Sequence, residues 1–347
     1  MPCPCYGDHP SLGADANAVV VTTNIFEASF GSFGSVGMYT FSKSGLEAGA
    51  AAGMFAQIVA SGSTFPYSLV PATIPPGGAF EARGAGTEYL TSAFDPTMAT
   101  DNRIALWALS GTSTINSHPP SLTLSYVEVG SETYGQPPSS TEQRSGPTPL
   151  GVSLSPPEPR ETISCGFPDA TQVATFAQHK VWAALNTGVV TGGEARCGIA
   201  YFAIKPVFLG SGLAGATMSK QGYIAVNNGS VINPALAVNS DDDVMIGFTL
   251  TGAAFWPSAG YAQVAPGKVG KVHVGAAGTQ PEDGFMGYRY FGGNGEAIWG
   301  SYSGAAVDES GNMWWATEMI PNLPRGTFAN WGTAIGSVAP DANQAAN

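Results

Sequence analysis

The sequence is poor in charged side chains. Only 11% of its 347 residues are Asp, Glu, Lys or Arg, whereas about 25% is usual for a globular domain. Charged, straight-chain residues normally cover the solvent faces of helices, so their shortage argues against a helix-rich fold. Ser and Thr supply much of the polar surface instead, and the 46 glycines and 26 prolines favour turns. The composition therefore predicts an all-β protein.

Basic residues are especially scarce. The chain has 13 Lys and Arg against 25 Asp and Glu, a net charge of −12 at pH 7, and it contains no basic run. Binding to the phosphates of nucleic acid or of an anionic membrane needs clustered cations. We therefore expect no nucleic-acid partner. The most apolar stretch, residues 48–60, is too short to cross a bilayer, so no membrane insertion is expected.

The N-terminus has neither the basic segment nor the apolar segment of a signal peptide. The charge-poor, Ser/Thr-rich composition is nevertheless typical of an exported protein. We therefore expect an extracellular or periplasmic location. One explanation that reconciles the two observations is that the chain lacks its natural N-terminal part.

Two cysteines and one acidic run are candidates for a disulfide and a metal site. Cys165 and Cys197 flank a group of predicted strands and are the candidate disulfide, the alternative being two buried thiols. The four histidines are scattered and do not match the spacing of zinc ligands. Asp241 and Asp243 are candidate calcium ligands, although the run they belong to lacks the alternating spacing that wraps one ion. No cofactor is predicted, and structural calcium stays open.

Three segments repeat one pattern, and internal repeats decide the fold. Each has a strand of small residues, an Asp or Asn, a polar turn, and a strand of β-branched or aromatic residues, which predicts a β-hairpin. The segments are residues 10–24, 234–249 and 303–318, with Asp15, Asn239 and Asp308 at the shared turn position. An oxygen there accepts hydrogen bonds from the turn amides, so these three side chains are expected to be structural.

Residues 104–126 and 172–203 fit the same pattern more loosely. The repeats start near residues 9, 87, 170, 233 and 302, roughly 60 to 85 residues apart. This spacing exceeds the about 40–50 residues of a simple blade, which implies long loops. We place such loops at residues 71–86 and 134–161, and one short helix at residues 42–52. The prediction is a β-propeller with about five recognisable blades in this chain, and five to seven in the complete ring. It forms one domain over residues 1–340, followed by a disordered tail, residues 341–347.

Four further stretches carry a family resemblance. They read GDHPSLGAD at residues 7–15, DNRIALWAL at 101–109, PEDGF at 281–285 and NWGTAIG at 330–336. With these segments the chain resembles secreted bacterial β-propeller proteins that are distantly sialidase-like, of the Asp-box type, and mostly uncharacterised. The likeness runs over nearly the whole chain and implies the fold, but the family has no settled activity to carry over.

The chain also departs from the family pattern. Where relatives usually read Arg-Trp-Gly-Asp-Tyr-Ser, residues 298–303 read IWGSYS, so the arginine and the aspartate are both absent. A site that needed that charge pair would be impaired here. Relatives also tend to have another blade upstream of residue 7, in keeping with a missing N-terminal part.

Aligning the repeats places residues 7–10, 232–234 and 300–303 at the starts of inner strands, which ring one mouth of a propeller's central channel. The functional interpretation is a polar ligand-binding cup. The structural alternative is that the same side chains satisfy turn amides.

A second binding cluster is predicted around residues 288–290, because aromatic rings and a guanidinium suit sugars or carboxylates. A packed Tyr/Arg pair explains these residues equally well. The ligand-binding candidates are Asp8, His9, Asn233, Tyr288, Arg289, Tyr290, Trp299, Ser301 and Tyr302.

The leading functional hypothesis is an exported binding or interaction module for a glycan or an extracellular protein. The alternative is a sialidase-like glycoside hydrolase, since glycoside hydrolysis needs two nearby carboxylates. The acids available near the motif segments are Asp8, Glu282, Asp283 and Glu318. Of these, Asp8 and Glu318 are the candidate catalytic acids. A second alternative is a structural cell-surface protein. Two carboxylates facing each other beside Arg103 or Arg289 in one concave site would favour the enzyme.

Overall fold

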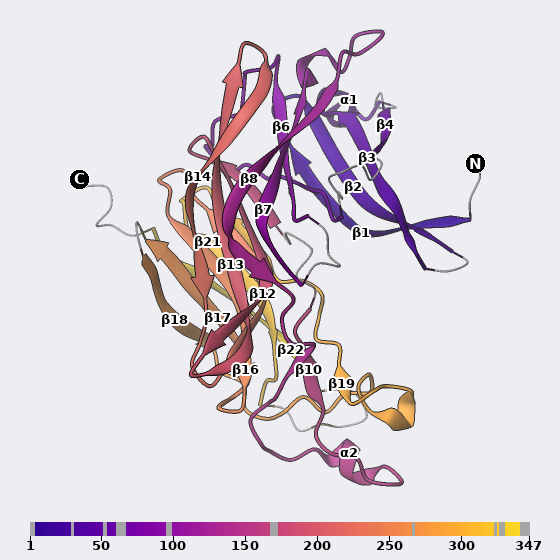
Figure 1. Ribbon diagram of the computed structural model, residues 1–347, viewed down its shortest axis with the longest axis vertical. Coiled ribbons are helices and arrows are strands. Elements are labelled where there is room, and N and C mark those ends of the chain that lie inside the picture. The colour runs from indigo at the N-terminus through magenta and orange to yellow at the C-terminus, as the bar shows by residue number, and fades with distance from the viewer. Residues whose placement is uncertain are drawn as a thin grey trace. The chain divides into compact units, whose positions relative to one another are not determined.

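The computed structural model describes residues 4–28, 31–50, 54–59, 67–94, 99–166, 173–265, 268–322, 325 and 330–340. Strands dominate them, and the helices are short: α1 (Lys43–Glu47), α2 (Pro149–Ser153) and the 3-10 turns η1 (Thr112–Thr114) and η2 (Arg289–Phe291) (Figure 1). The chain is all-β, as predicted. The helix expected at residues 42–52 is confirmed in its first half, and residues 51–52 lie outside the described part.

Five sheets follow one another along the chain, and within each the strands are hydrogen-bonded in chain order. We call these sheets blades I to V. Blade I comprises β1 (Cys5–Ala14), β2 (Ala18–Glu27), β3 (Phe33–Ser42) and β4 (Met54–Val59); blade II comprises β5 (Val70–Pro71), β6 (Thr87–Ser92), β7 (Thr100–Ser110) and β8 (Thr123–Gly135). Blade III comprises β11 (Val173–Ala177), β12 (Lys180–Thr191), β13 (Glu194–Leu209) and β14 (Gly212–Ile224). Blade IV comprises β15 (Ser230–Val238), β16 (Val244–Gly252), β17 (Phe255–Ala265) and β18 (Lys268–Ala276); blade V comprises β20 (Gly304–Val307), β21 (Met313–Met319) and β22 (Gly332–Val338). The fold class is a β-propeller, and the described residues provide five blades.

A small sixth sheet lies outside the blades. Its strands are β9 (Ser140–Thr141), β10 (Thr162–Ser164) and β19 (Glu296–Ala297), in the order β19-β10-β9. β10 pairs with β19 in parallel and with β9 antiparallel. Most of the predicted loop 134–161 is indeed irregular, but this sheet ties its two ends together.

The repeated hairpins have the predicted geometry. Oδ1 of Asp15 accepts the backbone N–H groups of the residues two and three further on, at 2.8 and 2.7 Å. Oδ1 of Asn239 and Oδ1 of Asp308 each accept hydrogen bonds from the backbone N–H groups of the residues two and four positions further along the chain, at 2.9 to 3.0 Å. The structural role expected for the three side chains is confirmed, because each holds its turn closed.

Two inner strands share an unusual backbone feature. His9 and Asn233 both have a left-handed backbone, with φ of 57° and 56°, and each precedes a proline. The strand pairing shifts register at both places, in β1 between Asp8 and Ser11 and in β15 between Ile232 and Ala235. The two positions that the repeat alignment made equivalent are thus equivalent bulges.

The start of the second blade was predicted wrongly. The repeat pattern placed it near residue 87, whereas its first strand is β5, inside the expected loop 71–86. The strand is only two residues long and ends on a proline, which has no backbone N–H to give to a ladder. Neither its length nor its composition distinguishes it from a loop.

The chain divides into two compact units. Unit 1 contains residues 1–133, 169–183 and 201–221, and unit 2 contains residues 134–168, 184–200 and 222–347. The division falls inside β12 and β13. The single domain over residues 1–340 stays a prediction, and the tail 341–347 lies outside the described residues.

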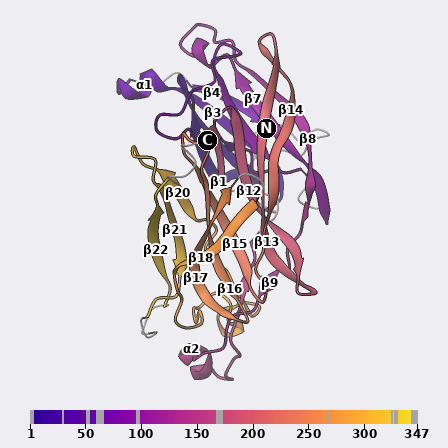
Figure 2. The same cartoon turned by 90° about the vertical axis from the view of Figure 1, so that its left-hand side faces the viewer.

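Each unit packs its blades through apolar side chains. In unit 1, Val20 and Met38 of blade I and Leu90 and Trp107 of blade II belong to one buried cluster. In unit 2, blade V packs on blade IV around Trp315 (Figure 2). A methyl group added to Gly275 would overlap the Trp315 ring, so a residue without a side chain lets the ring lie against the strand. In the described part of the chain no helix is long and apolar enough to cross a bilayer.

Candidate active site

Unit 2 gathers four carboxyl groups from segments far apart in the sequence. Glu161 precedes β10, Glu282 and Asp283 lie in the connection between β18 and β19, and Glu318 lies near the end of β21. Glu161 and Glu282 are 2% and 6% exposed, and Asp283 is fully buried. We call these four residues the acidic cluster.

Asp283 is the anchor of the acidic cluster. Its carboxylate accepts hydrogen bonds from the Tyr288 hydroxyl at 2.5 Å and from the backbone N–H groups of Leu150 and Gly151, in the first turn of α2, at 2.8 and 3.2 Å. Nε of Arg325, a buried side chain, lies 3.7 Å from Oδ2. Burial followed by this carboxylate raises the pKa of the Tyr288 hydroxyl, so Tyr288 stays a donor. Asp283 therefore holds two loops together.

Glu161 and Glu282 are joined through Gln143. The Gln143 amide donates to the Glu161 backbone carbonyl at 3.0 Å and accepts the Glu282 backbone N–H at 2.8 Å. Within the described residues, however, both carboxyl oxygens of Glu161 and Oε2 of Glu282 are buried without a hydrogen-bond partner. Burial, then the neighbouring Glu282 carboxyl, raises the pKa of Glu161 far above its usual value. Burial also raises the pKa of Glu282. The pair is therefore suited to hold a proton at neutral pH.

Glu318 is the more accessible member of the acidic cluster. Its side chain is half-buried and lies over the backbone of Gly300, where an added methyl group would be 2.7 Å from Oε2. Burial, then the charge of Glu282, raises the pKa of Glu318. A half-buried carboxyl group whose pKa is raised is a candidate general acid.

Several predicted binding residues surround Glu318. The Asn233 amide donates to the backbone carbonyls of Trp299 and Gly300 at 3.0 and 2.8 Å, which fixes the segment between β19 and β20 that lies under Glu318. Trp299 is buried and donates its indole N–H to the Thr249 hydroxyl at 3.1 Å. Asn233 and Trp299 thus support the site from within, as Tyr288 does.

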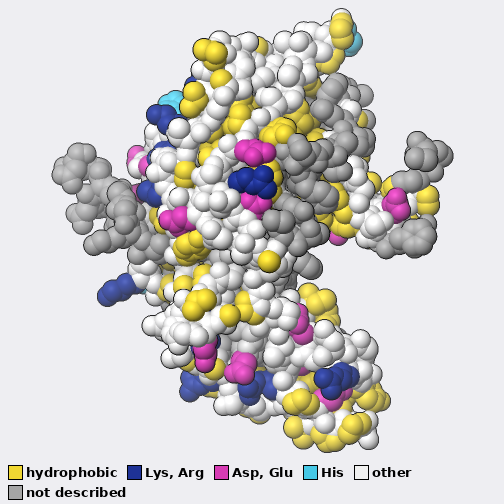
Figure 3. Space-filling model, viewed as in Figure 1, with side chains coloured by type: hydrophobic (Ala, Val, Ile, Leu, Met, Phe, Trp, Pro, Cys, Tyr) yellow, Lys and Arg dark blue, Asp and Glu magenta, His cyan; other side chains and the backbone are white. Residues whose placement is uncertain are grey.

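The exposed candidates lie on the neighbouring segments of unit 2. The Glu158 carboxylate accepts the backbone N–H groups of Arg289 and Tyr290, at 2.8 and 2.7 Å, and so fixes η2. Tyr290 and Tyr302 are 61% and 49% exposed, and Ser301 is exposed as well. Figure 3 shows hydrophobic side chains gathered at the lower end of the view, where η2 and α2 lie, on a face otherwise dominated by uncharged polar groups and backbone.

Asp8 and His9 belong to unit 1, whereas the other members of the predicted cup belong to unit 2. Oδ1 of Asp8 accepts the His9 backbone N–H at 2.9 Å, and the Asp8 carbonyl accepts the Thr23 hydroxyl at 2.8 Å. Burial, opposed by Asp8, lowers the pKa of His9. The cup as a whole stays a prediction.

The predicted arginine positions have local partners. Arg103 pairs with Asp101 at 3.0 Å and with Glu128 at 3.5 Å, and its guanidinium lies over the Phe94 ring in unit 1. The Glu161 and Glu282 carboxyl groups interact with each other in unit 2, but the arginine whose charge acts on Glu282 is Arg325 and not Arg103 or Arg289. The sequence pattern identified Glu282, Asp283 and Glu318 as available acids but missed Glu161 and Arg325. No motif marks either, since only the tertiary fold brings them to the cluster.

The candidate metal ligands serve the hairpin between β15 and β16. Oδ2 of Asp243 accepts the Asn239 amide at 3.1 Å, and the Asp241 backbone N–H is held by Asn239. The described residues contain no group of three or more His, Cys, Asp or Glu side chains placed to hold a metal ion.

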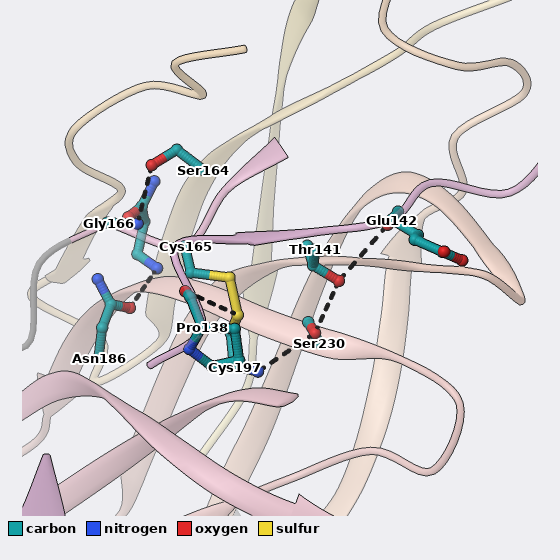
Figure 4. The surroundings of a disulfide bond; sticks show 10 residues. Pro138, Thr141, Glu142, Ser164, Cys165, Gly166, Asn186, Cys197 and Ser230 are labelled. Atoms are coloured by element: carbon teal, nitrogen blue, oxygen red, sulfur yellow. Dashed lines mark hydrogen bonds between the residues drawn. A yellow bond between two sulfur atoms is a disulfide. The ribbon is translucent and has the colours of Figure 1, made fainter. Parts of the chain in front are cut away.

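The predicted disulfide between Cys165 and Cys197 is present, with the two Cα atoms 6.0 Å apart (Figure 4). It joins the end of β10 to the start of β13, and both cysteines are buried beside Ile163 and Trp299. The covalent link therefore fixes the small sheet that carries Glu161 to blade III within unit 2.

No protein-family profile and no curated protein matches the chain. Among solved structures, a glycoside hydrolase aligns with a TM-score of 0.27 and 10% identity, over 97% of this chain and 60% of that one. The chain thus spans less than two thirds of that protein. A GH62 hydrolase in complex with xylotriose aligns with a TM-score of 0.29 and 8% identity, over 96% of this chain and 91% of that one. The site is therefore interpreted from its own geometry.

Proposed function

We propose that this protein is a glycan-directed hydrolase whose acid–base chemistry takes place at the acidic cluster. The observation that carries the proposal is the gathering of Glu161, Glu282 and Glu318 in one unit, with the pKa of each carboxyl raised by burial and by its acidic neighbours. Environments that raise a carboxyl pKa are typical of catalytic acids in glycosidases.

In this proposal the carboxyls have separate roles. Glu318, half-buried, donates a proton to the oxygen of the leaving sugar. Glu282 is the second carboxylate that glycoside hydrolysis requires, acting on a water molecule or on the sugar carbon. Glu161 is a positioning residue, because it holds a proton next to Glu282 and so limits the repulsion between the acids. The arginines do not support a sialidase-like mechanism, because Arg325, the arginine at the acidic cluster, is paired with Asp283.

A screen with aryl glycosides and oligosaccharides, xylotriose included, tests the proposal. Turnover of at least one substrate is expected, and Glu318→Gln should lower kcat by about 100-fold or more, in the range expected for loss of a general acid. Glu309→Gln, which removes an exposed acid from a hairpin turn of the same blade, should leave kcat unchanged. Absence of turnover across the screen would reject the enzyme, and full activity of Glu318→Gln would reject Glu318 as its acid.

A binding module remains the second candidate because of the exposed aromatic side chains around η2. Phe285, Tyr290 and Phe291 are 42%, 61% and 46% exposed, and their rings meet edge to face at 5.3 and 5.1 Å between centroids. Aromatic rings of this kind offer a stacking surface to sugar rings. A glycan array probed with wild-type protein and with Tyr290→Ala tests this function. A binding module should bind a glycan without hydrolysing it, and the variant should lose that binding.

A further inference from the structure

A cavity of about 420 Å³ lies next to the disulfide in unit 2. β9, the start of β13, the turn before β15 and the hairpin between β16 and β17 enclose it. Its volume falls within the range of about 300–1,000 Å³ that is usual for ligand pockets. Its lining includes Ser140, Glu142, Arg196, Asn228, Ser230 and Ala253, and it shares no residue with the acidic cluster.

Several polar groups in this cavity have no partner in the described part of the chain. Ser140, Glu142 and Asn228 make no side-chain hydrogen bond there. Nε of Arg196 is buried and lacks an acceptor, although the same guanidinium pairs with Glu194 through another nitrogen. Buried donors are nearly always satisfied in native proteins, so an unmet one beside a cavity points to a ligand or to bound water.

The wall behind these groups is fixed. The Ser230 hydroxyl accepts the Cys197 backbone N–H at 3.3 Å and shares a hydrogen bond of 2.9 Å with the Thr141 hydroxyl. Sγ of Cys197 lies 3.9 Å from the Pro138 carbonyl oxygen (Figure 4). The disulfide and these bonds therefore hold the backbone of β9, β13 and β15 that forms this wall, which lowers the entropic cost of ordering the cavity around a ligand.

The charge and chemistry of the lining restrict the ligand. Two carboxylates, Glu142 and Glu194, outnumber the guanidinium of Arg196, which disfavours an anion. The lining offers both donors and acceptors, and its apolar residues include small ones such as Ala195 and Ala253. Hydroxyl groups, which donate and accept, suit such a lining. We propose that this cavity binds a small neutral polyhydroxylated ligand, a single sugar unit, at a site separate from the acidic cluster.

Calorimetric titration of the whole protein with D-glucose, D-galactose, D-xylose and L-arabinose tests the proposal. At least one sugar is expected to bind with one site per chain. Ala253→Trp should abolish that binding, because the indole would fill the cavity from an exposed turn. Ala254→Trp is the matched control, since the neighbouring residue of the same turn does not line the cavity, and it should bind as wild type does. Glu142→Ala, which removes an exposed side chain, should weaken binding about tenfold.

The inference is overturned if none of the four sugars binds, or if binding survives Ala253→Trp with unchanged affinity. Thermal unfolding of each variant checks that the fold is intact. Glu318→Gln should bind the sugar as wild type does, so the failure of the proposed enzyme activity and the failure of this site can be told apart.

Discussion

At the scale of single residues, the acidic cluster shows how surroundings give different roles to the same chemical group. Asp283 has donors on both carboxylate oxygens and a buried arginine beside it. Glu161, at the same depth, has no hydrogen-bond donor to either oxygen among the described residues. The first environment supplies hydrogen-bond donors to its carboxyl group, whereas in the second, burial raises the pKa of Glu161.

Asp283→Ala should lower the free energy of unfolding by about 3 kcal/mol, since it leaves Tyr288, Arg325 and two backbone donors without their buried acceptor. Denaturant unfolding of the two proteins measures this difference. Glu309→Ala, at an exposed turn position, should change the same quantity by no more than about 0.5 kcal/mol. Equal effects of the two substitutions would contradict the anchoring role of Asp283.

Glu161→Gln should alter the dependence of stability on pH. Below the usual pKa of 4.5, both the folded and the unfolded chain hold the Glu161 proton, and its stabilising contribution is fully present. Above that value the unfolded chain loses the proton while the folded chain keeps it, so the free energy of unfolding falls until the folded carboxyl also titrates. Glutamine has no such proton, and the variant should lose less stability than wild type as pH rises above 4.5. Unfolding curves measured at a series of pH values would refute this if both proteins showed the same slope.

At the scale of elements, close contacts between an indole ring and glycines join the blades of unit 2. Trp315 of β21 lies where a side chain at Gly275 in β18 or Gly336 in β22 would overlap the ring. The ring also packs on Met245 of β16, in the same buried cluster. One aromatic side chain thus connects strands of blades IV and V.

Gly275→Ala should destabilise the protein by about 1–3 kcal/mol, because the added methyl group must displace the Trp315 ring from a packed position. The control is Gly215→Ala in β14, where an added methyl group meets nothing within 4 Å and the free energy of unfolding should stay the same or rise slightly. Thermal unfolding of both variants provides the comparison. A Gly275 variant as stable as the Gly215 variant would show that the ring moves aside freely.

At the scale of the whole molecule, charge sets the first limit on partners. With a net charge of −12 and 13 basic residues in total, the protein repels polyanions at long range. We expect no shift of double-stranded DNA in a gel mobility assay at physiological salt, with a basic protein of similar size as the positive control. A salt-sensitive complex would contradict the prediction and would require a local basic surface.

Local pattern and long-range assembly differ in how far the sequence predicts them. The hairpins around Asp15, Asn239 and Asp308 were predictable because each turn is closed by atoms within four residues of one another. β5 was missed because two residues ending in a proline carry no periodic signal. Glu161 and Arg325 were missed for a different reason. Glu161 lies more than a hundred residues before Asp283 along the chain and Arg325 about forty residues after it. Their relation to Asp283 exists only after these segments have packed together.

The division of the chain inside β12 and β13 has a consequence for synthesis and for cleavage. Unit 1 takes its last strands from residues 169–183 and 201–221, which follow the first segment of unit 2. During translation, unit 1 therefore cannot be completed until part of unit 2 has already left the ribosome. For the same reason no single cut of the backbone releases either unit as a complete fragment.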